Sequence, residues 1–124
     1  MVSFKDFFMQ DGISIYLQIL LYIKRGIIAG NIQDGEELPS RRMLSALLGI
    51  NPNTVQKAYK LLEDEGLIQS RTGAKSCVVV TEQKLKEIRN ELLEEDAKKV
   101  IYALKQMGIT REEAHMLIDN CWEG

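Results

Sequence analysis

Two short helical patterns, separated by one tight turn within residues 40–66, constrain the fold of this chain more than any other feature. Ser40 is a suitable N-cap for the first pattern, and Gly49 ends it. Asn51 caps the second pattern, which ends at Gly66 in the left-handed position that glycine favours. Helical spacing predicts buried faces made of Met43, Leu44, Leu47 and Leu48 in the first helix, and Val55, Ala58, Tyr59 and Leu62 in the second. Two such helices with so short a connection predict a helix-turn-helix.

Strand patterns follow this motif and a helical pattern precedes it. Residues 67–70 and 76–80 are predicted to be short strands joined by the sequence RTGAK, which indicates a hairpin with a basic tip. A further helix is expected between the N-cap Ser14 and Gly30. Residues 1–80 are therefore predicted to form a winged helix-turn-helix domain, mainly α-helical with a small β-hairpin. The buried face of its first helix is expected to contain Tyr16, Leu17, Leu20, Ile23 and Ile27.

Residues 81–124 are expected to form a separate C-terminal tail of two helices. A long amphipathic pattern begins near Thr81 or Glu82 and ends at Gly108. Thr110 and Glu113 then give the capping-box pattern that begins a short last helix.

Two helices cannot bury these apolar residues alone, so the tail must pack against another surface. The favoured interpretation is the same surface of a second chain, which makes this a two-helix dimerisation tail, and the alternative is the chain's own winged domain. The residues expected at the dimer interface are Leu85, Ile88, Leu92, Val100, Ile101, Leu104, Leu117, Ile118 and Trp122.

The positive charge is unevenly distributed. The whole chain has a net charge of −2, yet residues 38–76 carry six Arg or Lys residues and only three acidic ones. Those three acids, at positions 63–65, end the second helix of the helix-turn-helix and would repel a phosphate backbone. The N-terminal half of that helix is therefore the half expected to enter a DNA groove.

The side chains of that half suit DNA. With the apolar face buried, Asn53, Lys57 and Lys60 point outward, while Thr54 and Gln56 lie on the flanks. Asn and Gln can pair with adenine, Thr with a thymine methyl group or a phosphate, and Lys with guanine or phosphate. The alternative interpretation is an ordinary surface helix whose charges are solvated.

The chain from residue 15 to residue 80 resembles the DNA-binding domain of GntR-type bacterial transcription regulators. The segment LPSRRMLSALLGINPNTVQKAYKLLEDEGLI matches that family in order, spacing and residue type. The chain departs from many members at Pro52 and Gln56, where arginine is common, and at Lys75, where a second wing glycine is common. The resemblance and the residue types together predict DNA contacts from Arg41, Arg42, Asn51, Pro52, Asn53, Thr54, Gln56, Lys57, Lys60, Arg71, Gly73 and Lys75.

The short tail narrows the resemblance further. About 44 residues follow Val80, too few for a domain that encloses a ligand. This length and the variant NPNTVQKAY resemble the YtrA subgroup, whose tail serves dimerisation. The resemblance implies a homodimeric repressor that binds a palindromic operator. It also implies that the repressed operon encodes an ABC transporter and the regulator itself.

Two alternatives stay open. The first is a winged-helix protein–protein interaction module without specific DNA binding. The second keeps DNA binding and adds a small-molecule effector, held in a cleft between the tail and the winged domain near Tyr102, Cys121 or Trp122.

Other classes of protein are not indicated. The single histidine, His115, has no arrangement around it that suggests a triad, and there is no phosphate loop, paired-glycine fingerprint or CxxC, so no enzyme is expected. Cys77 and Cys121 are expected to be reduced thiols, with no metal site and no cofactor. The apolar run at residues 19–23 is far shorter than the roughly 20 residues of a membrane span, and the N-terminus does not resemble a secretory signal, which predicts a cytoplasmic protein.

Overall fold

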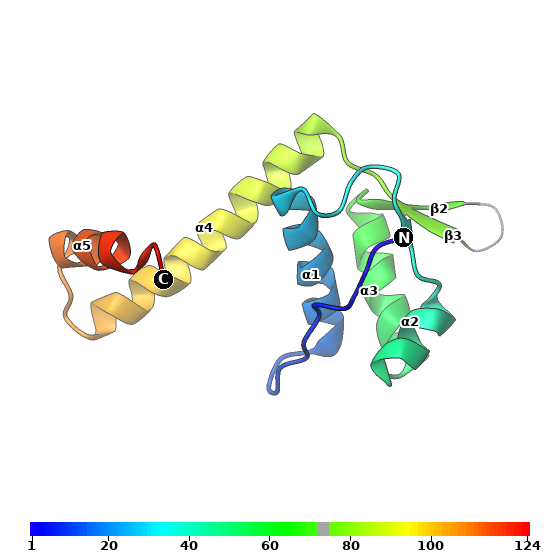
Figure 1. Cartoon of the computed structure of the whole chain (residues 1–124), viewed down its shortest axis with the longest axis horizontal. Helices are drawn as coiled ribbons and strands as arrows, with labels where there is room; N and C mark the ends of the chain where they lie inside the picture. The colour runs from blue at the N-terminus through cyan, green and yellow to red at the C-terminus, as the bar shows by residue number, and fades with distance from the viewer. Residues whose placement is uncertain (72–74) are drawn as a thin grey trace. The chain divides into compact units, whose positions relative to one another are not determined.

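The computed structural model describes residues 1–71 and 75–124, and it is mainly helical with a small antiparallel sheet, as predicted (Figure 1). These residues divide into two compact units, Met1–Ile88 and Arg89–Gly124. The elements are α1 (Ile15–Ala29), β1 (Glu37–Leu38), α2 (Arg41–Leu48), α3 (Pro52–Asp64), β2 (Ile68–Arg71), β3 (Lys75–Val78), α4 (Glu82–Gln106) and α5 (Arg111–Cys121).

The predicted helix-turn-helix is confirmed in α2 and α3, and the predicted caps form it. Ser40 Oγ accepts a hydrogen bond from the amide of Met43 at 3.0 Å, which begins α2. Asn51 Oδ1 accepts one from the amide of Asn53 at 2.8 Å, which begins α3. Between them Gly49 has φ of 67°, a left-handed conformation that a side chain would disfavour. The turn is therefore encoded by local residues on both sides of it.

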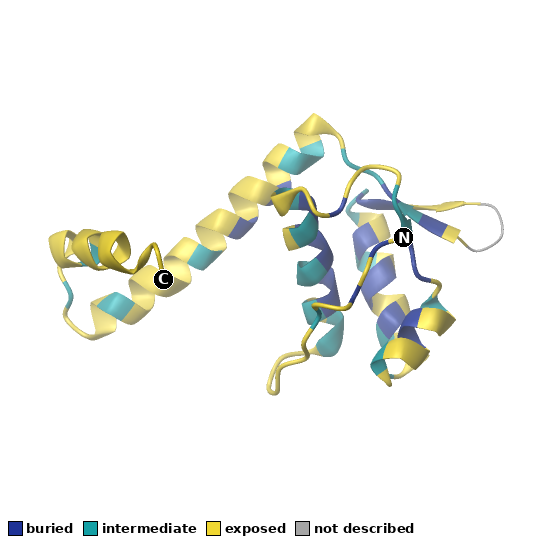
Figure 2. Ribbon diagram, viewed as in Figure 1, coloured by how far each residue is buried: buried dark blue, intermediate teal, exposed yellow. Residues whose placement is uncertain are grey.

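The predicted buried face of α3 is confirmed, since Val55, Ala58, Tyr59 and Leu62 all have no exposed surface. This face packs with α1 and α2, and Figure 2 shows buried residues along both α1 and α3. The hydroxyl of Tyr59 donates to the backbone oxygen of Pro39 at 2.7 Å, and burial raises the pKa of Tyr59. This bond satisfies the one polar atom of a fully buried ring.

The faces predicted for α1 and α2 are confirmed in part, since Leu20, Ile23 and Ile27 of α1 are buried as expected. In α1, Ile19 is buried while Leu17 is exposed. In α2, Leu44 is fully buried, but Met43 and Leu47 are 49% and 64% exposed. The eight residues of α2 make little more than two turns, so only a narrow side of the helix can meet the core.

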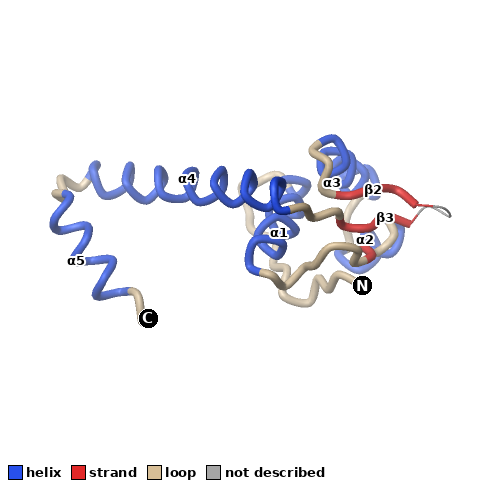
Figure 3. The backbone as a smooth tube through the Cα atoms, turned by 90° about the horizontal axis from the view of Figure 1, so that it is seen from above, coloured by secondary structure: helices blue, strands red, loops and turns tan. Residues whose placement is uncertain are grey.

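The wing is a three-stranded sheet with the order β1-β3-β2. β2 and β3 pair antiparallel, with Ile68 opposite Val78 and Arg71 opposite Lys75, and Figure 3 shows the two strands side by side. The sequence does not predict β1, because two residues are too few to show an alternating pattern. Pairing of β1 with β3 ties the wing to the segment that leads into α2.

The N-terminal segment also belongs to the first unit. Val2 and Phe4 are buried, and the amide of Val2 donates to the backbone oxygen of Glu37 at 2.8 Å. The rings of Phe4 and Phe7 both lie against Tyr22 of α1, at centroid distances of 5.0 and 5.3 Å. An aromatic cluster therefore anchors the start of the chain to α1.

The first unit extends beyond the predicted boundary at residue 80, because the first turns of α4 belong to it. Ile88 is only 4% exposed and is part of the core, and Leu85 packs against that core. Leu92 is also buried. Ile88 thus has a role within the core of one chain, and the place of these three residues at a dimer interface stays a prediction.

The second unit contains the rest of α4 and α5. The predicted capping box is confirmed: Thr110 Oγ1 accepts from the amide of Glu113 at 3.2 Å, and Glu113 Oε1 accepts from the amide of Thr110 at 3.4 Å. α5 has no buried residue. Across the described residues, no helix combines the length and the hydropathy that a membrane span requires.

Candidate nucleic-acid interface

The exposed half of α3 carries the side chains expected to read DNA. The capping residue Asn51 and the helical residues Asn53, Gln56 and Lys57 are exposed, and Thr54 is half-buried. Pro52 occupies the first turn, where its missing N–H costs no helical hydrogen bond. Since the opposite face of α3 is in the core, the backbone holds these amide, hydroxyl and ammonium groups toward solvent.

Two lysines on α3 have different partners. Lys57 Nζ lies 3.9 Å from the centroid of the Tyr16 ring, which comes from the first turn of α1. Lys60 Nζ instead lies 3.2 Å from Asp64 Oδ1, one turn further along α3. An aromatic ring leaves the charge of Lys57 in place, whereas a carboxylate offsets that of Lys60.

The two arginines of α2 are also in different surroundings. The guanidinium carbon of Arg41 lies 5.3 Å from the centroid of the Tyr59 ring. Its Nε is buried and makes no hydrogen bond within the part of the chain that the structure describes. Arg42 is exposed at the start of α2. Arg42 is therefore the better placed of the two to reach a phosphate, while Arg41 also packs on the core tyrosine.

In the wing, Arg71 and Lys75 face each other across the β2–β3 pair and both are exposed. Lys75 Nζ is 3.7 Å from Glu37 Oε1 of β1, a pair that solvent screens. Gly73, the predicted wing-tip contact, lies outside the described residues.

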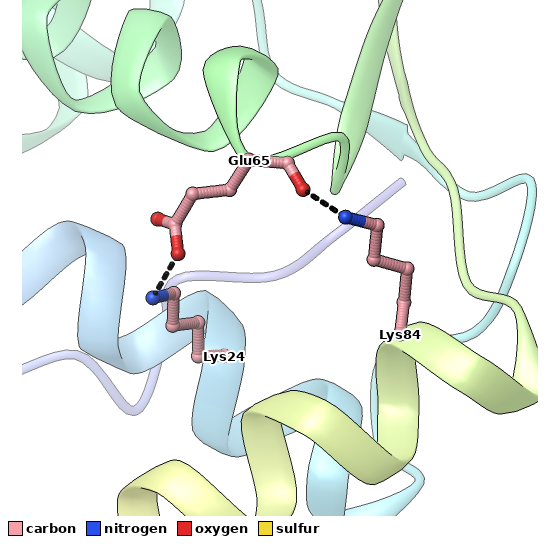
Figure 4. A network of polar contacts seen from close by, with 3 residues as sticks. All are labelled: Lys24, Glu65 and Lys84. Atoms are coloured by element: carbon pink, nitrogen blue, oxygen red, sulfur yellow. Dashed lines mark hydrogen bonds and ion pairs between the residues drawn. The ribbon is translucent and has the colours of Figure 1, made fainter.

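The acidic end of α3 is joined to two lysines that the sequence analysis did not single out. Glu65 Oε1 lies 2.8 Å from Nζ of Lys24 in α1, and Lys84 Nζ of α4 donates to the backbone oxygen of Glu65 at 2.9 Å (Figure 4). Lys24 is almost fully buried, and its only sequence signal was its place one turn after Leu20 on the apolar side of α1. These bonds fix the end of α3 opposite to the exposed amides.

Among the described residues, no three His, Cys, Asp or Glu side chains lie together as potential metal ligands. Cys77 is half-buried and Cys121 is exposed, both as free thiols.

A helix-turn-helix with a β-wing, whose second helix exposes amides and basic groups, defines the winged class of DNA-binding domains. Residues 15–79 match the bacterial regulatory proteins of the gntR family, and the chain belongs to this family.

Curated relatives agree with this assignment and with the YtrA-like subgroup. The chain is 34% identical to the HTH-type transcriptional repressor YtrA of Bacillus subtilis, over 82% of this chain and 78% of YtrA. It is 29% identical to the HTH-type transcriptional regulator YhcF of the same organism, over 84% of this chain and 86% of YhcF. The chain is thus a transcription regulator with a DNA-binding domain and, as predicted, falls among regulators rather than enzymes.

Solved structures show the same fold. A GntR family transcriptional regulator from Listeria monocytogenes is 27% identical with a TM-score of 0.81, covering 90% of this chain and 98% of that chain. YtrA from Sulfolobus acidocaldarius, a GntR-family transcription factor, is also 27% identical, with a TM-score of 0.55 and coverage of 93% of both chains.

Proposed function

We propose that the protein is a homodimeric repressor that binds a palindromic operator through the N-terminal half of α3. The observation that carries this proposal is the division of α3 into a fully buried apolar face and an exposed face of amides and basic groups. The proposed groove and phosphate contacts are Arg42, Asn53, Thr54, Gln56 and Lys57.

The charges along α3 support one orientation on DNA. Lys57 lies in the half that begins at Asn51, whereas Glu63, Asp64 and Glu65 lie at the other end. A phosphate backbone attracts the first half and repels the second, so the N-terminal half enters the major groove. Arg71 and Lys75 of the wing contact neighbouring phosphates.

Dimerisation is proposed to use the second unit. Its exposed apolar side chains include Val100, Ile101, Leu117 and Ile118, and Trp122 is 78% exposed. A groove of about 490 Å³ lies between the end of α4 and α5, lined by Leu104, Ile109 and Ala114 among other residues. So much apolar surface on a small helical pair indicates an interface, and a second copy gives the two α3 helices that a palindrome requires.

The regulated operon is proposed from the subgroup. From the resemblance to YtrA-like regulators, we propose that the protein controls an operon that encodes an ABC transporter and the regulator itself. Action on chromosomal DNA places the protein in the cytoplasm. An effector that binds near the tail would be recognised by a change in operator affinity on its addition.

The proposal is tested by titrating the protein against a labelled fragment from upstream of its own gene, with unrelated DNA as competitor, at two salt concentrations. We expect two protomers per site, resistance to the competitor and affinity that falls steeply with salt. Equal binding to both fragments would contradict autoregulation, and absence of binding at both salt concentrations would favour the protein–protein interaction module.

A further inference from the structure

Tyr16 of α1 and Lys57 of α3 form a contact that the predicted DNA interface does not explain. Lys57 Nζ lies 3.9 Å from the centroid of the Tyr16 ring, well within the roughly 6 Å over which a ring face attracts an ammonium group. Tyr16 is half-buried against the core, and Lys57 is exposed. We propose that Tyr16 is a positioning residue for DNA binding, whose ring holds the ammonium group of Lys57 ready to meet a backbone phosphate. This inference rests on the proposed function.

The ring is held by the fold before any DNA arrives. Tyr16 is followed on α1 by Ile19 and Ile23, which are fully buried in the core that α1 shares with α3. Packing of these two helices therefore sets where the ring lies relative to Lys57. A free lysine has four flexible side-chain bonds and loses that freedom when it binds a phosphate. A lysine already held over a ring has less freedom to lose.

The side chain that each lysine contacts decides how much of the lysine's positive charge remains available to DNA. Lys60 lies beside Asp64 and Lys75 beside Glu37, so a carboxylate offsets the charge of each of these two predicted contacts. Tyr16 carries no charge, so Lys57 keeps its full positive charge. The N–H groups that point away from the ring stay free to donate to phosphate oxygens. Tyr16 thus orders Lys57 without neutralising it.

The test compares the DNA affinity of four variants on one duplex. This duplex carries the DNA sequence that is most enriched when the wild-type protein selects from a pool of random sequences. Lys57→Ala should lower the slope of log affinity against log salt by about one, as expected for one lost phosphate contact. Tyr16→Leu should weaken binding roughly two- to five-fold, the range for an exposed cation–π contact, with the slope unchanged. Tyr16→Phe keeps the ring and should bind as the wild type does. In the double variant, Tyr16→Leu should add nothing to Lys57→Ala.

The matched control is Tyr16→Leu combined with Lys60→Ala, whose effects should be additive because Lys60 is paired with Asp64 and Lys57 is the lysine that lies over the ring. A merely structural role for Tyr16 would weaken binding equally with and without Lys57, which would overturn the inference. Tighter binding by Tyr16→Leu would overturn it as well, since the ring would then compete with DNA for Lys57. Weak binding by Tyr16→Phe would assign the contact to the hydroxyl instead.

A measurement without DNA separates this inference from the proposed function. In the free protein, the protons on the carbon next to Lys57 Nζ should show an upfield NMR shift caused by the ring in the wild type and in Tyr16→Phe. This shift should be lost in Tyr16→Leu.

The DNA selection tests the proposed function separately. If the selection with the wild-type protein enriches no DNA sequence, the proposed function fails. If the wild type selects a sequence and all Tyr16 variants bind it equally, only the role of Tyr16 fails.

Discussion

Lys24 Nζ lies 2.8 Å from Glu65 Oε1, so an ion pair joins the middle of α1 to the residue that follows α3. The side chain of Lys24 is 5% exposed and that of Glu65 is 39% exposed. An ammonium group so far from water needs a partner, and Glu65 supplies it from the end of the proposed recognition helix.

Replacing Glu65 with Gln should therefore destabilise the first unit. The change removes the charge that Lys24 faces and leaves a buried ammonium group without its counter-ion, at a cost of about 1–3 kcal/mol because solvent still reaches Glu65. Urea unfolding followed by circular dichroism measures the change. Asp64→Asn is the control, because it breaks only the exposed pair with Lys60 and should cost less than about 1 kcal/mol.

Arg42→Ala and Thr54→Ala should each weaken operator binding about 10- to 100-fold without changing the oligomeric state. Arg42 is exposed at the start of α2 and Thr54 lies in the first turn of α3, so neither is a core residue. Fluorescence anisotropy with a labelled operator measures the affinity. Arg89→Ala removes an exposed arginine of the second unit that is not among the proposed DNA contacts, and this control should bind almost as the wild type does. Unchanged affinity in both test variants would refute this set of contacts.

Gly26→Ala should destabilise the fold by about 1–3 kcal/mol, because the space beside Gly26 is already filled. A Cβ atom at this position would lie 2.5 Å from Cδ1 of Ile32, which is itself buried. Thermal unfolding measures the loss. Combining the change with Ile32→Ala removes the clash, so the double variant should lose less than the sum of the single losses; simple additivity would show that the contact is not the cause.

Ile101→Glu should convert a dimer into a monomer while the winged unit stays folded. Ile101 lies in the second unit and is half-exposed in a single chain, so a glutamate there can remain in contact with water and the chain stays folded. In an apolar dimer interface the same carboxylate would be buried without a partner, which disfavours the dimer. Sedimentation at several concentrations measures the change, with Lys99→Glu as a control at an exposed neighbouring position. Ile88→Glu should behave differently and unfold the winged unit, because Ile88 is in its core.

Trp122 offers an optical measurement of the same interface. It is the one tryptophan in the sequence and is 78% exposed in a single chain. If it anchors a dimer, its emission should shift to shorter wavelength as concentration rises through the dissociation constant, and Ile101→Glu should abolish the shift. A constant emission maximum over a range in which sedimentation detects dimerisation would exclude Trp122 from the interface.

Local rules predicted the recognition helix well. Asn51 and Gly66 mark its limits, and the spacing of Val55, Ala58, Tyr59 and Leu62 indicated the buried face that the structure confirms. The same rules failed for Met43 and Leu47, which are apolar and have helical spacing but remain exposed. Periodicity shows which residues share a face, and only the position of the neighbouring helices shows how much of that face is covered.

The sequence by itself determined the helices, the caps of α2, α3 and α5, the turn and the hairpin, because each depends on residues within a few positions of one another. The expected cap of α1 differs, since the side chain of Ser14 makes no capping hydrogen bond. It also determined the family, through the order of those residues. Tertiary structure alone decided that Ile88 belongs to the winged core, that Lys24 pairs with Glu65 and that Tyr16 lies under Lys57. The last two pairs join side chains 41 positions apart, and only the packing of α1 against α3 brings such distant residues together.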